Sequence, residues 1–312
     1  MEFSNLTQLT EYFSDKQKCV EYLTNLRWAG NVTCTFCGHD KVYELKGANK
    51  RFKCAKCRQQ FSAIKGTIFE NSPISLQTWF VAVYILTAHK KGISSVQLAT
   101  DLGVTQKTAW FMAHRIRFAL KVKSFDTQMD GIVQADETFM GGKNKNRHAD
   151  KKVPESQGRS VKDKTPVLGM VDDEGNVRTH VIPNTQAKTI KPIIEKMVKS
   201  GSIVVTDEWQ AYRQLRMNYI HVVVNHNEGK YVNGPYSTNR IEGFWSILKR
   251  GVYGIYHQVS AKHLHRYCDE FSYRYNSRQI KANERFEATI QDTHSCRLTY
   301  KELIKEQSPL PE

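Results

Sequence analysis

The stretch Ile132-Val-Gln-Ala-Asp-Glu-Thr-Phe139 is an apolar run that leads into two acids, and it sets the fold of the C-terminal half. Its pattern predicts a β-strand with Asp136 at its end. Residues 167–182 follow as two apolar runs around an Asp-Asp-Glu-Gly-Asn turn, which is typical of a hairpin. A third short apolar run, Ile203-Val-Val-Thr206, predicts a buried strand that leads directly into Asp207.

Helical and extended patterns alternate over the rest of this half. The expected elements are helices at 190–198, 209–215, 237–249 and 262–276 and a strand at 221–224. Three early strands followed by alternating helices and strands predict an α/β domain with a mixed sheet. The apolar-poor, basic stretch 143–164 is expected to be a mobile loop whose cations either contact phosphates or are simply solvated.

Three acids in this half are candidates for catalysis. Asp136 and Asp207 follow strands, and Glu242 lies on a predicted helix, with 34 residues between it and Asp207. Carboxylates at strand ends are where α/β sheets gather ligands, and three of them could hold two Mg²⁺ ions. Each acid also has an ordinary explanation: Asp207 fits a helix N-cap, Glu242 fits a solvated helix position, and only one of the adjacent Asp136 and Glu137 can face a shared site.

Two Cys-x-x-Cys pairs dominate the N-terminal half. Sixteen residues separate them, and the four cysteines are Cys34, Cys37, Cys54 and Cys57. A two-residue gap lets both thiolates of a pair face one ion, so two pairs complete a tetrahedral Zn²⁺ site. Short alternating runs between the pairs predict strands, and the whole predicts a structural zinc ribbon whose metal supplies folding energy.

Residues 92–117 have the form of a helix-turn-helix. Gly103 ends a short helix and Thr105 caps a second one, with a plain helical hairpin as the alternative. The start of the second helix would reach base edges in a major groove, and its later cations would contact DNA. The expected DNA-binding residues are Gln106, Lys107, Thr108, Arg115 and Arg117.

The chain of 312 residues carries a net charge of +15 and is 40% hydrophobic. These values exclude wholesale disorder and favour a polyanionic partner, first of all nucleic acid. Residues 1–125 hold 18 Lys and Arg against 8 Asp and Glu, or +10, so the excess lies where a DNA-binding module is expected. No apolar run is long enough to cross a membrane, and no secretory signal is present, so we expect a cytoplasmic, nucleoid-associated protein.

Together these features resemble one family of enzymes. The stretches that carry the resemblance are the paired Cys-x-x-Cys motifs, Gly66-Thr-Ile-Phe69, Gly92-Ile-Ser94, Ala109-Trp-Phe-Met112, Ala135-Asp-Glu-Thr-Phe-Met-Gly-Gly-Lys143, Val205-Thr-Asp-Glu208 and Thr238-Asn-Arg-Ile-Glu-Gly-Phe-Trp-Ser-Ile-Leu-Lys-Arg-Gly251. From Trp28 to about Arg278 the chain is similar to bacterial insertion-sequence transposases of the DDE class, in the ISXO2-like group with an N-terminal zinc ribbon and helix-turn-helix.

The resemblance implies an RNase H-like catalytic core in which Asp136 and Asp207 are the first two Mg²⁺ ligands. Members of the group have Glu or Asn at the third position, and this chain offers both Glu242 and Asn239. We favour Glu242, because a carboxylate holds a second Mg²⁺ better than an amide. Lys249 is expected to contact the DNA phosphate near the cleaved bond.

The expected domains are N-terminal helices at 1–30, a zinc ribbon at 31–68, a helix-turn-helix at 69–125, a catalytic domain at 126–290 and a tail at 291–312. The expected function is to bind double-stranded DNA at the ends of a mobile element, cleave it and join the 3′ ends to target DNA, as a homo-oligomer. The alternatives are a non-catalytic DNA-binding regulator and an RNase H-like nuclease without strand transfer.

Overall fold

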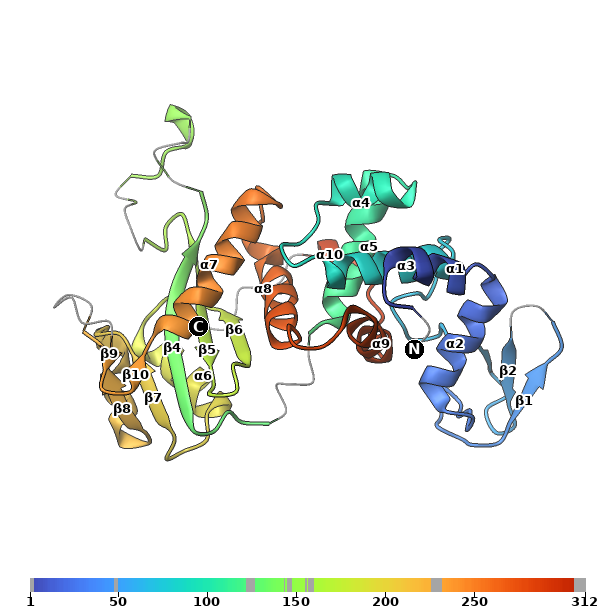
Figure 1. Ribbon diagram of the computed structural model, residues 1–312, viewed down its shortest axis with the longest axis horizontal. Helices are drawn as coiled ribbons and strands as arrows, with labels where there is room; N and C mark the ends of the chain where they lie inside the picture. The colour runs from blue at the N-terminus through green and yellow to red at the C-terminus, as the bar shows by residue number, and fades with distance from the viewer. Residues whose placement is uncertain are drawn as a thin grey trace. The chain divides into compact units, whose positions relative to one another are not determined.

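A computed structural model describes residues 3–47, 50–121, 127–142, 144, 148–154, 156, 160–225 and 232–305. The chain divides into two compact units. Among the described residues, the first unit consists of Phe3–Lys121 together with Ser277–Lys305, and the second ends at Asn276. Figure 1 shows the elements of each unit. Part of the loop expected at 143–164 lies outside the described residues, namely residues 143, 145–147, 155 and 157–159.

The zinc-ribbon part of the first unit is a three-stranded antiparallel sheet, β1 (Val42–Leu45), β2 (Arg51–Cys54) and β3 (Gln60–Phe61). Helix α1 (Leu6–Tyr12) and helix α2 (Lys16–Trp28) precede it. The ring of Trp28 packs against Phe52 and Phe61, with ring centroids 5.7 and 6.0 Å apart. This aromatic cluster is the small apolar core of the ribbon.

The helical part of the first unit contains α3 (Leu76–Ala88), α4 (Ser95–Leu102) and α5 (Gln106–Ala119). Ser94 caps α4 and Thr105 caps α5, each through its side-chain oxygen, and Gly103 ends α4 in the left-handed conformation with φ +64°. The two expected helices are therefore present with the expected caps, which fit the helix-turn-helix and the plain helical hairpin alike.

The C-terminal segment belongs to the first unit, which corrects two of the expected boundaries. Helices α9 (Ala282–Asp292) and α10 (Tyr300–Ile304) lie in it, whereas the sequence placed residues 277–290 in the catalytic domain and 291–312 in a tail. The physical reason is aromatic packing: Phe286 of α9 lies edge-on to Phe80 of α3, with ring centroids 5.7 Å apart.

The second unit is built on a five-stranded sheet in the order β6-β5-β4-β7-β8. Strand β5 is antiparallel to both of its neighbours, and β7 and β8 run parallel to β4, so the sheet is mixed, as expected. The strands are β4 (Ile132–Met140), β5 (Thr165–Val171), β6 (Val177–Val181), β7 (Ile203–Thr206) and β8 (Ile220–Val223). This is the mixed α/β core that the sequence predicted.

Helices cover both faces of this sheet. On one face α6 (Ala187–Met197) and the 3₁₀ helix η4 (Gln210–Met217) pack on residues such as Val133 and Val204. On the other face lie α7 (Asn239–Gly254) and α8 (Ala261–Asn276). The second unit also contains the short 3₁₀ helix η3 (Ala149–Lys151) and a two-stranded antiparallel sheet of β9 (Val232–Asn233) and β10 (Tyr236–Ser237).

Strand β4 is longer than expected, so Asp136 is the fifth of its nine residues and not its end. The pairing of β4 with β5 continues from Gln134 to Met140, and it holds the acidic stretch in an extended conformation. The pairing with β7, in contrast, stops at Gln134. Asp136 therefore lies just past the end of the parallel pairing, although it is in the middle of its strand.

Candidate functional site

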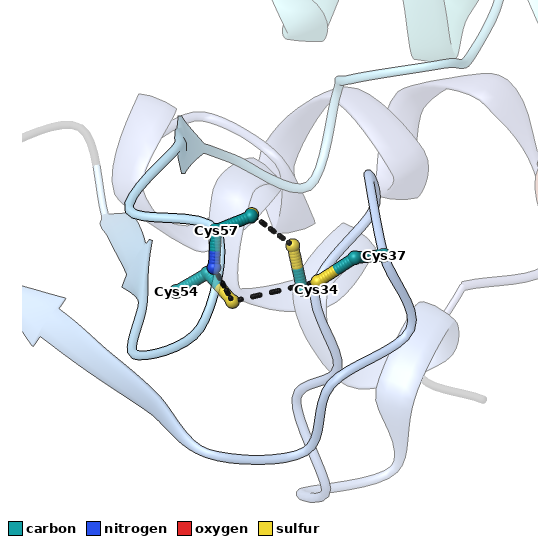
Figure 2. A group of neighbouring side chains, drawn as sticks. All are labelled: Cys34, Cys37, Cys54 and Cys57. Carbon is teal, nitrogen blue, oxygen red and sulfur yellow. Dashed lines mark hydrogen bonds between the residues drawn. The ribbon is translucent and has the colours of Figure 1, made fainter.

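Four cysteine side chains converge in the ribbon (Figure 2). The Sγ atoms of Cys34, Cys37, Cys54 and Cys57 all lie within 4.8 Å of one another. Cys34 Sγ lies 3.6 Å from Cys57 Sγ, and Cys37 Sγ lies 3.7 Å from Cys54 Sγ. Four thiolates around a tetrahedral Zn²⁺ with Zn–S bonds of about 2.3 Å lie about 3.8 Å apart, so the cluster fits zinc.

One backbone amide from each Cys-x-x-Cys pair donates a hydrogen bond to a sulfur atom of this cluster. The amide of Phe36 donates to Cys34 Sγ and that of Cys57 donates to Cys54 Sγ, each at 3.4 Å. Such donors stabilise thiolate charge and fix the directions of the sulfur atoms. The residues expected to bind zinc thus form one structural Zn²⁺ site.

The two candidate aspartates of the second unit occupy equivalent places on neighbouring parallel strands. Gln134 of β4 pairs with Val205 of β7, and Asp136 and Asp207 each come two residues after that pair. Neighbouring strands lie about 4.8 Å apart, and residues two apart share a face. Asp207 directly follows β7, as expected from the sequence.

Asp136 and Glu137 point to opposite faces of the sheet. Asp136 Oδ2 accepts a hydrogen bond of 3.0 Å from Nε1 of Trp245, which lies on α7. Glu137 faces the side of η4, where the buried Tyr212 lies. Burial raises the pKa of Tyr212 well above its usual value, and the negative charges of Glu137, Asp136 and Asp207 raise it further. The charges of all three carboxylates therefore act on Tyr212, although Asp136 and Glu137 lie on different faces of the sheet.

The other two candidate carboxylates also accept hydrogen bonds from neighbouring residues. Asp207 Oδ1 accepts from the amide of Trp209 at 3.0 Å, and Glu242 Oε1 accepts from Thr238 Oγ1 at 2.7 Å. Within the ranges that the structure describes, the four cysteines are the only group of three or more Cys, His, Asp or Glu side chains whose ligand atoms lie close enough together to hold one metal ion. Asp136 lies on β4, Asp207 follows β7, and Glu242 lies on α7. Their carboxylate oxygens are not as close to one another as the four sulfur atoms of the cysteines are.

The remaining candidates of this site lie on the exposed face of α7. Asn239 is the first residue of the helix, and both Asn239 and Glu242 are exposed. Lys249, two turns after Glu242, is exposed as well. Their oxygens and the ammonium group can therefore reach a ligand placed over this face.

The start of α5 is accessible, as DNA binding through this helix needs. Gln106 and Lys107 are exposed, and Thr108 is half-buried. Gln106 Nε2 donates to Ser95 Oγ at 2.8 Å, and the ammonium of Lys107 lies 5.4 Å from the ring centroid of Tyr300.

Arg115 and Arg117 do not fit the expected DNA-binding role. They are only 4% and 2% exposed, because α5 is covered along its second half. Arg115 donates to the carbonyl oxygens of Leu298 and Glu70, at 2.9 and 2.7 Å. The guanidinium of Arg115 therefore stabilises the first unit and is not available to a phosphate.

Two groups of residues near the candidate sites were not predicted from the sequence. The first is the pair Gln134 and Trp245, which link β4 to α7; a glutamine inside an apolar strand was the available signal. The second is a set of exposed cations on the ribbon, which the basic composition of residues 1–125 could have indicated: Lys41, Lys46, Arg51, Lys56 and Arg58.

No helix in the described ranges is both long and apolar enough to cross a membrane.

Comparison with known proteins matches residues 128–276 to the ISXO2-like transposase domain and residues 14–60 to the transposase zinc-ribbon domain. The first match ends at Asn276, where the second unit of the structure also ends.

Two relatives and one solved structure are similar to the chain. "Uncharacterized protein in transposable element ISH50" of Halobacterium salinarum is 28% identical over 76% of this chain and 83% of its own. "Uncharacterized transposase-like protein" of Haemophilus influenzae is 35% identical over 34% of this chain and 85% of its own. "Crystal structure of a pre-cleavage Mos1 transpososome" matches 68% of this chain and 78% of its own at 13% identity, with a TM-score of 0.25 that is too low to show a shared fold.

The two domain matches follow each other in the order of the ribbon and the mixed sheet, and the Haemophilus relative is matched over most of its length. The chain belongs to the transposases with an ISXO2-like domain preceded by a zinc ribbon.

Proposed function

We propose that this protein is an active transposase that binds the ends of a mobile element, cleaves them and transfers the 3′ ends to target DNA. The observation that carries the proposal is the equivalent placement of Asp136 and Asp207 on neighbouring parallel strands. Family membership supports the same reaction class. Glu242, on the helix that packs over β4, is the proposed third acid.

The acids supply hard oxygen ligands of the kind that Mg²⁺ prefers. Asp136, Asp207 and Glu242 would be the protein ligands of the Mg²⁺ ions. Bound Mg²⁺ would activate the attacking oxygen and stabilise the leaving oxygen during in-line phosphoryl transfer. Asn239 supports the site from the first turn of α7, and the ammonium of Lys249 neutralises a phosphate near the cleaved bond.

DNA binding is proposed for the first unit. The exposed ends of Gln106 and Lys107 suit contacts with base edges, and the exposed cations of the ribbon suit phosphates. A transposase must hold two element ends, so we propose that the protein acts as a homo-oligomer on double-stranded DNA.

Product analysis tests the proposal. A labelled element end is incubated with the protein, Mg²⁺ and a target plasmid, and the products are separated on a denaturing gel. The proposal predicts nicked ends and joined end–target products. Cleavage without joining would favour the nuclease alternative, and binding without cleavage would favour the regulator.

A further inference from the structure

Trp245 is a buried side chain with one polar atom, and that atom contacts a candidate metal ligand. The side chain is 3% exposed and lies on α7. Its Nε1 donates to Oδ2 of Asp136 at 3.0 Å. A buried indole N–H needs a partner, and here the partner is a carboxylate, which makes the hydrogen bond charge-assisted.

A glycine makes room for this indole. Gly169 of β5 is the register partner of Asp136 on β4. A Cβ atom at residue 169 would lie 2.5 Å from two ring carbons of Trp245, which is shorter than the contacts that Cβ atoms make in proteins. The absence of a side chain at residue 169 therefore lets the ring lie over β5 beside Asp136.

A second hydrogen-bonded link sets the position of α7 along β4. Gln134 Oε1 accepts from the amides of Arg240 and Ile241, at 3.0 and 3.2 Å. The first amides of a helix have no partner within the helix, and the N-cap residue Thr238 makes no side-chain cap here. A side chain of the strand therefore caps α7, two residues before Asp136.

We propose that Trp245 is a positioning residue for Asp136: its N–H fixes the plane of the carboxylate for metal binding. The terminal torsion of an aspartate is broad, so a single fixed donor restricts it strongly. Carboxylates that bind metals are commonly held in this way by an outer hydrogen-bond partner. This inference rests on the proposed function, in which Asp136 is a Mg²⁺ ligand.

Trp245→Phe tests the inference, because it removes the N–H and keeps an aromatic ring over Gly169. Trp79→Phe is the matched control, since Trp79 is also buried and donates its N–H, to Ser72 Oγ at 3.0 Å, within the first unit. Mn²⁺ binding to the full-length, zinc-loaded protein is measured by electron paramagnetic resonance, with Asp136→Asn to identify the site. Thermal unfolding is followed in parallel.

We expect Trp245→Phe to weaken Mn²⁺ binding about 10-fold or more, while Trp79→Phe binds like the parent. Cleavage by Trp245→Phe should recover at high Mn²⁺. Unchanged Mn²⁺ affinity in Trp245→Phe, with or without lower stability, would overturn the role of Trp245 alone. A parent protein that binds no Mn²⁺ at Asp136 would overturn the proposed function, and the role of Trp245 with it.

Discussion

Cys34 Sγ lies 3.6 Å from Cys57 Sγ, although 22 residues separate the two cysteines and they belong to different Cys-x-x-Cys pairs. The distance is close to the separation of about 3.8 Å between two thiolates on one tetrahedral Zn²⁺. The ribbon around them has a small core, so the metal is expected to contribute much of its folding free energy.

The first prediction concerns this metal. The reduced parent protein should contain one zinc per chain by metal analysis. Cys54→Ser should lose the zinc and unfold the ribbon, while Cys296→Ser, outside the cluster, should keep it. Freshly purified, reduced parent protein without zinc would contradict the assignment.

The second prediction concerns DNA binding by the exposed cations of the ribbon. Lys56→Glu should weaken the binding of the full chain to all DNA sequences alike, and it should reduce the salt dependence, because fewer counterions are released. Lys188→Glu makes the same charge change at an exposed position on α6 and is the control. Fluorescence anisotropy at several salt concentrations measures both effects. Equal losses in the two variants would argue against a specific role for the ribbon.

The third prediction concerns the buried Arg115. Arg115→Leu leaves the carbonyl oxygens of Glu70 and Leu298 without their donor, so we expect it to lower the unfolding free energy of the first unit by about 2–3 kcal/mol. Denaturant unfolding measures the loss. DNA affinity per folded molecule should stay within about two-fold of the parent value, since the side chain of Arg115 is buried and phosphate contacts need accessible cations. A stable variant with lost DNA binding would restore the direct contact expected from sequence.

The fourth prediction concerns pH. Burial raises the pKa of Glu70, but hydrogen bonds from Lys65 Nζ and the amide of Gly66, both at 2.7 Å, outweigh it, and the pKa is lowered. A lowered pKa in the folded state stabilises it above the unfolded pKa of 4.5, and this stability is lost as pH falls through the folded pKa. Glu70→Gln should therefore flatten the loss of stability below about pH 4.5, as measured by thermal unfolding. An unchanged pH dependence would contradict this role of Glu70.

Local patterns were enough to predict much of this fold. The spacing of the cysteines predicted the metal cluster, and Thr105 and Gly103 marked the helix ends because capping is a local interaction. Alternating apolar runs predicted the strands that carry Asp136 and precede Asp207, although β4 proved longer than its apolar run.

Long-range packing explains what the sequence did not predict. Arg115 looks like a solvent-facing cation in the sequence, and only the fold shows that residues far along the chain cover it. Helix α9 belongs to the first unit because Phe286 packs against Phe80, and a contact between residues so far apart in the chain cannot be predicted from a local sequence pattern. The same holds for Gln134 and Trp245, whose partners lie more than 100 residues away.

The central claim is that Asp136, Asp207 and Glu242 carry out metal-dependent catalysis. Mg²⁺-dependent cleavage of a labelled element end, by Asp136→Asn, Asp207→Asn, Glu242→Gln and Asn239→Ala side by side, tests it most directly. We predict that the three carboxylate variants bind DNA like the parent but do not cut it, and that Asn239→Ala cuts more slowly. If Glu242→Gln cuts normally and Asn239→Ala does not cut, the third ligand is Asn239. If all four variants cut like the parent, the catalytic role of these residues is contradicted.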